Sequence, residues 1–269
     1  MKGRLNNALI NWLTLIAKLT GGLILLVCLK IPPALAATNC TQVNQIPQSE
    51  CNTLVILYKS TDGPNWNDSP DNNWYITNTP CDWAGITCSG RHVTEINRED
   101  KRLVGTLPNL SALTYLQSLD LGCYSWCNQL TGALPNLSAL TKLTFLDLSG
   151  NEFSGTINIS SLPRSLQKLY LADNQLEGAV PIFKDKFTSL THLDLGGNYL
   201  TVPVEPTDPI DSHFPPTLEV LDLYRTSLNR PLSYLNLKIL SDLTYLNLSS
   251  TQLSGTIYAN YFPKSLTTL

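Results

Sequence analysis

The stretch that decides the fold is Leu143–Ile157, LTFLDLSGNEFSGTI, because its spacing of Leu, Asn and Gly returns along most of the 269-residue chain. Successive copies begin 23 to 28 residues apart. A period of this length is typical of proteins built from stacked structural repeats. Aligned on the first apolar residue, the copies start at Val93, Leu116, Leu143, Leu166, Leu190, Leu218, Leu243 and Leu266.

Leucines alternate with other residues inside each copy, as Leu146 and Leu148 do around Asp147. This alternation predicts a short β-strand that turns one apolar side inward. One strand cannot bury that side alone, but copies stacked about 4.8 Å apart would form a parallel sheet over a continuous core. Each buried leucine would contribute about 1.5 to 3 kcal/mol, so stacking is favourable where a single copy would be unfolded.

An asparagine occupies the ninth position of four copies, where the chain leaves the predicted strand. We expect its amide to satisfy backbone groups that the turn leaves unpaired, each of which would otherwise cost about 1 to 3 kcal/mol. Thr226 and Thr251 take this position in two later copies, so the ladder should be weaker there. The predicted ladder consists of Asn128, Asn151, Asn174 and Asn198.

Several copies share a tail with the pattern LxGx(I/L/V)P, seen at Leu103–Pro108, Leu130–Pro135 and Leu176–Pro181. With this tail and the period, the chain is identified as a member of the plant-type subclass of leucine-rich repeat proteins. The resemblance covers about residues 40–269. It implies an α/β solenoid, a right-handed superhelix with a parallel β-sheet on its concave face. About seven repeats are expected over residues 91–269; the last is truncated, which suggests a fragment of a longer protein.

The N-terminal segment has the pattern of an export signal. Lys2 and Arg4 precede an apolar run, and Pro32–Ala36 provides a small-residue cleavage site, so residues 1–36 are a predicted signal peptide. The alternative is an uncleaved membrane anchor over Ala8–Leu29, which Lys18 interrupts. We expect a secreted, extracellular or cell-surface protein, or a periplasmic one in a bacterium. Contact with a membrane is expected only if the signal stays uncleaved or the chain continues past residue 269.

Six cysteines follow the predicted cleavage site. An even number behind an export signal favours disulfides in an oxidising compartment. A metal site is disfavoured, because no CxxC and no nearby histidine accompanies them. Proximity favours the pairs Cys40 with Cys51, Cys81 with Cys88, and Cys123 with Cys127, the last within an insertion that lengthens one repeat.

Residues 37–90 lack the repeat and are predicted to form a disulfide-stapled, partly helical cap on its first end. We expect Ser49 to begin a helix with Leu54, Leu57 and Tyr58 on its apolar face, and Asp62–Pro64 to end it.

Two cap motifs extend the family resemblance. Cys81–Cys88 resembles the CxWxGVxC element of plant-type N-terminal caps, and Leu57–Trp66 is similar to the form in secreted bacterial members. Trp66, Trp74 and Trp83 are expected to cover the core of the first repeat; a sugar-stacking site is the alternative.

The first repeat is irregular, since Arg98 falls where a core leucine belongs. A buried, unpaired arginine would be very costly. Either the register slips at this point, or Arg98 pairs with a carboxylate of the cap. No functional role is inferred for the charged run Arg98–Arg102, which is explained more simply as a solvated rim.

Composition and motifs argue against several functions. The net charge is −3 with 14% charged residues, so no nucleic-acid partner is expected. No nucleophile, zinc or nucleotide motif is present, and His92, His192 and His213 lack an implied catalytic partner. We expect a protein that is not an enzyme and needs neither a cofactor nor a metal.

Candidate binding residues come from side chains that flank the inward leucines and should form columns across neighbouring strands. Rigid aromatics among short polar groups suit recognition, and aspartates on adjacent strands would attract a cation or a basic partner. The LDL sequence is also common in the family whatever is bound. The candidate ligand-binding residues are Asp120, Phe145, Asp147, Lys168, Tyr170, His192, Asp194, Asp222, Tyr224 and Tyr245.

The sequence therefore indicates a binding module that recognises a protein, peptide or glycan through its concave face. The resemblance leaves two alternatives. One is an inhibitor of a secreted enzyme, as in plant polygalacturonase-inhibiting proteins. The other is a structural or adhesive surface protein.

Overall fold

The computed structural model of the chain divides into two units, residues 1–36 and residues 37–269. It describes residues 37–269 except 70, 125–127, 202–212, 230, 232–236 and 257. The predicted signal peptide lies outside the described residues, as does most of Pro203–Pro216, an insertion rich in Pro and Asp that lengthens the repeat beginning at Leu190. No described helix is long and apolar enough to cross a bilayer.

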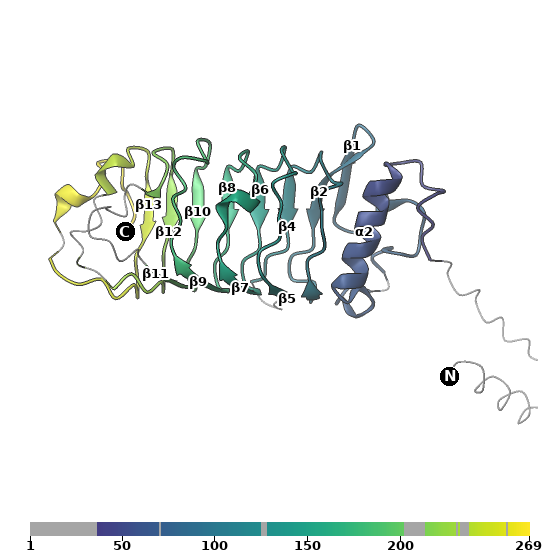
Figure 1. Cartoon of the computed structure of the whole chain (residues 1–269), viewed down its shortest axis with the longest axis horizontal. Helices are drawn as coiled ribbons and strands as arrows, with labels where there is room; N and C mark the ends of the chain where they lie inside the picture. The colour runs from purple at the N-terminus through teal and green to yellow at the C-terminus, as the bar shows by residue number, and fades with distance from the viewer. Residues whose placement is uncertain are drawn as a thin grey trace, which may run out of the picture. The chain divides into compact units, whose positions relative to one another are not determined.

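The second unit is a solenoid of stacked coils with one long sheet along its side (Figure 1). This eight-stranded sheet has the order β1, β2, β4, β6, β8, β10, β12, β13. All neighbours are parallel except β1 and β2, which are antiparallel. Its strands are β1 (Ile86–Ser89), β2 (His92–Asn97), β4 (Ser118–Asp120), β6 (Phe145–Asp147), β8 (Lys168–Tyr170), β10 (His192–Asp194), β12 (Val220–Asp222) and β13 (Tyr245–Asn247).

The register of this sheet confirms the predicted leucine spine. Leu146 pairs with Leu169, Leu169 with Leu193, and Leu193 with Leu221, all on adjacent parallel strands. These four residues are fully buried. The middle residue of each short strand therefore points into the core, and its two neighbours face outward.

A second sheet is built from the repeat tails, in the order β11, β9, β7, β5, β3. The glycine of the tail is required at its first strand. Gly105 has a φ of 127°, and a Cβ there would lie 2.2 Å from the Ser60 carbonyl oxygen at the end of the cap helix. The strands are β3 (Val104–Thr106), β5 (Gln129–Gly132), β7 (Glu152–Thr156), β9 (Gln175–Ala179) and β11 (Tyr199–Thr201).

In the described repeats, the segments between the two sheets contain short 3-10 turns. The one α-helix among the described residues belongs to the cap. These turns are η3 (Ile159–Ser161), η6 (Leu237–Ile239) and η7 (Ala259–Tyr261).

The asparagine ladder is present and links successive coils. Asn151 accepts a hydrogen bond from the backbone N–H of Leu130 at 3.0 Å and donates to the carbonyls of Leu121 and Leu148 at 2.9 and 3.1 Å. Leu121 and Leu130 belong to the preceding coil, so one side chain satisfies groups of two coils. Asn128, Asn174 and Asn198 are buried with the same arrangement.

The threonines that replace asparagine make a smaller contribution. The hydroxyls of Thr226 and Thr251 donate at 2.6 Å to the carbonyls of Leu223 and Leu248, in their own coil. A hydroxyl has one proton to donate, whereas the amide nitrogen has two. The predicted weakening of the ladder thus has a physical basis in the lost bond between coils.

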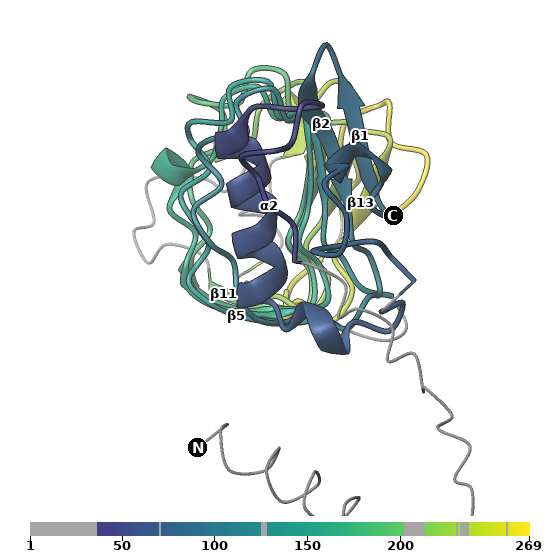
Figure 2. The same ribbon diagram turned by 90° about the vertical axis from the view of Figure 1, so that its right-hand side faces the viewer.

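The cap helix, α2 (Gln48–Ser60), lies across the first end of the coils (Figure 2). Leu54, Leu57 and Tyr58 are buried as predicted. The predicted start was wrong: the helix begins at Gln48 after Pro47, and Ser49 lies inside the first turn with no capping role. The cap also contains η1 (Gly63–Asn65) and η2 (Pro80–Asp82).

The three cap tryptophans pack in the core and do not form an open stacking site. Trp66, Trp74 and Trp83 are at most 2% exposed. Trp74 lies between the other two, with ring centroids 5.0 Å away on both sides. Such buried aromatic clusters contribute through both area and ring packing.

Arg98 occupies the core position without a slip of register, because the cap supplies a partner. Its side chain is 1% exposed and bonds to the Asp68 carboxylate at 2.6 Å and to the Ala84 carbonyl at 3.0 Å. The guanidinium lies 4.5 Å from the ring centroid of Trp66. Of the two expected alternatives, pairing with a cap carboxylate is therefore the correct one.

Two predicted disulfides are confirmed in the cap, Cys40 with Cys51 and Cys81 with Cys88. Cys123 is also disulfide-bonded. Its predicted partner, Cys127, lies outside the described residues.

Candidate functional site

The open face of the eight-stranded sheet consists of the side chains on either side of each inward leucine. Register places Phe145 beside Lys168, Lys168 beside His192, and Tyr170 between Asp147 and Asp194. The rings of Phe145 and Tyr170 are 5.7 Å apart. We call Phe145, Lys168, Tyr170, His192 and Asp194 the central patch; all five are half-buried.

The remaining candidate residues lie on either side of this patch. Asp222 lies on β12 and Tyr245 on β13. Val220 of β12 lies between His192 and Tyr245 in the row of residues that directly precede the inward leucines. Tyr224 lies two residues after the end of β12, with the Arg225 guanidinium 5.2 Å from its ring centroid. Asp120 lies on the opposite side, on β4.

The aspartates of the open face have a structural role that the sequence reasoning missed. Asp120 and Asp194 accept hydrogen bonds from the backbone N–H groups of Gly122 and Gly196, two residues further on, at 3.1 and 2.9 Å. Asp222 does the same for Tyr224 at 2.8 Å. Each carboxylate closes the turn that follows its strand, a local pattern that Asp readily forms. The sequence could have indicated this role, because each aspartate ends a predicted strand and the chain turns directly after it.

Asp147 departs furthest from its predicted role as an open contact. It is 3% exposed and accepts hydrogen bonds from the backbone N–H and hydroxyl of Ser149 at 2.8 and 2.5 Å, with a further bond from Tyr124. Gly122 packs beside it so closely that a Cβ there would lie 2.7 Å from Asp147 Oδ1. The expectation of an accessible carboxylate at this position is therefore corrected.

Burial makes the open face less acidic than the sequence suggests. Burial, with a smaller effect of neighbouring acids, raises the pKa of Asp120 to about 6 and that of Asp194 to about 7. The pKa of Asp147 is raised by burial too. Burial and the nearby Lys168 lower the pKa of His192, so this imidazole is neutral at pH 7. The central patch thus combines aromatic rings, one lysine and weakly charged polar groups.

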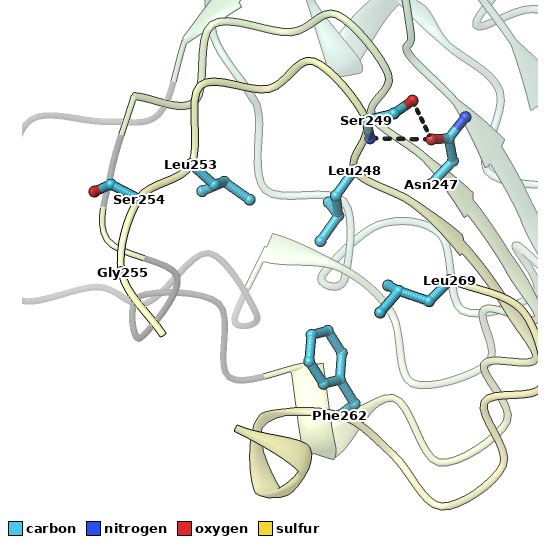
Figure 3. A pocket seen from close by; sticks show the side chains of 8 residues that line it. All are labelled: Asn247, Leu248, Ser249, Leu253, Ser254, Gly255, Phe262 and Leu269. Carbon is cyan, nitrogen blue, oxygen red and sulfur yellow. Dashed lines mark hydrogen bonds between the residues drawn. The ribbon is translucent and has the colours of Figure 1, made fainter. Parts of the chain in front are cut away.

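A hollow of about 380 Å³ lies at the last coil (Figure 3). Leu248, Leu253, Phe262 and Leu269 give it an apolar lining, and Asn247 at its rim accepts hydrogen bonds from Ser249. None of the predicted binding residues lines it. Its apolar lining consists of leucines and a phenylalanine, the residue types that fill the core of the other coils.

The described residues contain no cluster of histidine, cysteine, aspartate or glutamate that could hold a metal ion. The side chains of the open face offer hydrogen-bonding groups, aromatic surface and the charge of Lys168.

Family models match two parts of the chain. The model described as Leucine Rich repeats (2 copies) matches residues 164–206, and that described as Leucine Rich Repeat matches residues 142–162. Among curated proteins, the serine/threonine-protein kinase BRI1-like 2 of Arabidopsis thaliana is 30% identical over 139 residues, which are 50% of this chain and 10% of that protein. The chain spans only 8 to 10% of the length of the curated relatives it matches.

Two solved structures extend the similarity to most of the chain. The Arabidopsis receptor kinase HAESA, in complex with the peptide hormone IDA and the co-receptor SERK1, is 26% identical with a TM-score of 0.65, covering 81% of this chain and 35% of that one. A Pollen Receptor Kinase 3 is 26% identical with a TM-score of 0.58, covering 77% and 97%. Since the repeat period, the register of the sheet and these relatives agree, the chain belongs to the leucine-rich repeat proteins of the plant-type subclass.

Proposed function

We propose that this chain is an extracellular or cell-surface binding module, and that its central patch holds an extended peptide segment of its ligand. The observation that carries the proposal is the placement of Phe145, Lys168, Tyr170 and His192 on three adjacent strands, all facing outward. The similar structure of HAESA is a complex with a peptide hormone, which supports a peptide or protein partner here.

The patch has the dimensions and chemistry for a short peptide. Its strands, β6 to β10, together with the flanking β12, span about 14 Å at a spacing of about 4.8 Å. An extended peptide rises about 3.3 Å per residue, so about four residues would cross these strands. Phe145 and Tyr170 would contact an apolar or aromatic side chain, and Lys168 an acidic group of the peptide.

Binding at such a surface requires no chemical step, cofactor or metal. Stacked strands hold the patch side chains in place before the ligand arrives, which reduces the entropy lost on binding. The two cap disulfides are consistent with an oxidising compartment outside the cytosol.

The test uses peptides selected from a random display library on the intact protein, with dissociation constants measured by calorimetry. The patch variant is Lys168→Ala with Tyr170→Ala. A matched control is Lys184→Ala with Tyr199→Ala, which removes the same side-chain types from exposed positions away from the open face.

Peptides that bind the central patch should lose at least about tenfold in affinity on the patch variant, equivalent to about 1.4 kcal/mol, and less than about twofold on the control. Equal affinity for the wild type and the patch variant would refute this site. Peptide binding that persists in the patch variant and is lost in the control variant would move recognition to the surface around Lys184 and Tyr199.

A further inference from the structure

A second hollow, which is polar and distinct from the central patch, is lined by residues of three successive coils. Its residues come from the segments that lead from the strands of the second sheet back to the eight-stranded sheet. The hollow measures about 460 Å³, within the range of small-molecule sites. Apart from one leucine, its lining consists of Ser138, Thr141, Ser160, Ser165, Arg164 and Lys186.

Lys186 is fixed at the edge of this hollow by the backbone. Its ammonium donates to the carbonyls of Ile159 and Ser160 at 2.6 and 3.2 Å. An ammonium has three donors, so one remains for a ligand. Burial, and to a smaller extent the positive charge of Arg164, lowers the pKa of Lys186, as expected where a second cation lies nearby.

Arg164 supplies the second charge and is unengaged. It is exposed, and its guanidinium makes neither a hydrogen bond nor an ion pair with any other described residue. Among the described residues, no carboxylate lines the hollow. The described lining therefore holds two positive side chains and four hydroxyls, with no negative charge among them.

The repeat geometry alone does not produce this charge. A comparable hollow of about 400 Å³ lies one coil earlier, between Pro108 and Pro135, and has no charged residue in its lining. The coils thus create similar hollows, and the side chains at residues 164 and 186 make one of them basic.

We propose that this hollow binds a sulfate or phosphate group, carried by a small polar molecule such as a sugar ester. The planar guanidinium of Arg164 can donate two parallel hydrogen bonds to such an oxyanion, and Lys186 can donate a further charged hydrogen bond, which in a phosphate ester would also balance the second negative charge. Ser160 and Thr141 can hydrogen-bond the polar body. The hollow is larger than a bare oxyanion needs, which favours an esterified ligand over the free ion.

Calorimetric titration of the intact protein tests the proposal with three probes: sodium sulfate, glucose 6-sulfate and glucose 6-phosphate. Unmodified glucose serves as the neutral probe. Arg164→Gln removes a charge without removing a contact of the folded chain. Lys184→Gln is the matched control, because it makes the same change in net charge at an exposed residue outside the hollow.

Saturable binding of a charged probe with a dissociation constant of about 1 mM or tighter, weakened at least about fivefold by Arg164→Gln and less than twofold by Lys184→Gln, supports the site. Tighter binding of the sugar esters than of sulfate supports an esterified ligand, whereas equal affinities would show that the sugar adds nothing and would overturn that part of the proposal. The proposal is overturned if no charged probe reaches this affinity, if both variants weaken binding equally, or if glucose binds as well as its esters.

Discussion

Arg98 allows a sharp test of how the cap is joined to the repeats. Removing Asp68 and removing Arg98 should change the free energy of unfolding by very different amounts. Asp68→Ala would leave a guanidinium that is 1% exposed without its carboxylate. Arg98→Leu would instead place the usual core residue of the repeat at this position. Asp68, 28% exposed, would then keep Asn72 as a donor, and the Ala84 carbonyl would keep the indole N–H of Trp74 at 2.8 Å.

The expected magnitudes follow from this asymmetry. An unpaired buried charge costs about 3 to 5 kcal/mol, so Asp68→Ala should lower the free energy of unfolding by that amount. Replacing the buried charge by a leucine should leave stability within about 1 kcal/mol of the wild type, since apolar burial offsets the lost ion pair. The double variant should resemble Arg98→Leu and recover most of the loss.

Urea unfolding followed by tryptophan fluorescence measures these differences directly. Trp66 and Trp74 lie 4.5 and 5.7 Å from the guanidinium, measured to their ring centroids, so they report on this region. Asp71→Ala, which removes an exposed carboxylate nearby in the chain, is the control and should change stability by less than about 0.5 kcal/mol. If Arg98→Leu proves as damaging as Asp68→Ala, or if the double variant shows no recovery, the reasoning about the buried charge is wrong.

Three further predictions concern the repeats. Asn151→Ala should lower the free energy of unfolding by about 2 to 5 kcal/mol, because it leaves a buried N–H and a buried carbonyl unpaired. The same change at exposed Asn136, which closes a turn, should cost less than about 1 kcal/mol, and similar losses for both in urea unfolding would contradict the ladder. Burial raises the pKa of Asp194 from its ordinary 3.8 to about 7, so the carboxyl opposes folding increasingly as the pH rises between these values. Asp194→Asn keeps an acceptor for the turn and should therefore raise the urea midpoint more at about pH 8 than at about pH 4; a gain independent of pH would exclude this origin. Gly122→Ala should lower the thermal midpoint, because its new methyl group would lie 2.7 Å from Asp147 Oδ1, and an unchanged midpoint would mean that this contact relaxes freely.

The sequence by itself determined the solenoid, the leucine spine and the asparagine ladder. These features recur in successive copies along the chain, so Leu146 and its equivalents specify one inward face. A shift of the strand register by one residue would turn these leucines to solvent. The cap disulfides and the burial of the three tryptophans were also predictable, because nearby cysteines and large apolar rings have few other arrangements at the end of a repeat stack.

Only the tertiary structure decided what the irregular and outward-facing residues do. Arg98 is tolerated in the core because Asp68, 30 residues earlier in the chain, reaches it. The candidate aspartates prove to close turns, and the buried Asp147 also accepts a hydrogen bond from Tyr124 of another coil. Repetition fixes which residues point inward, since burial of apolar surface acts on every copy alike. The accessibility and charge of an outward residue depend on the particular neighbours that adjacent coils bring to it, and those neighbours do not repeat.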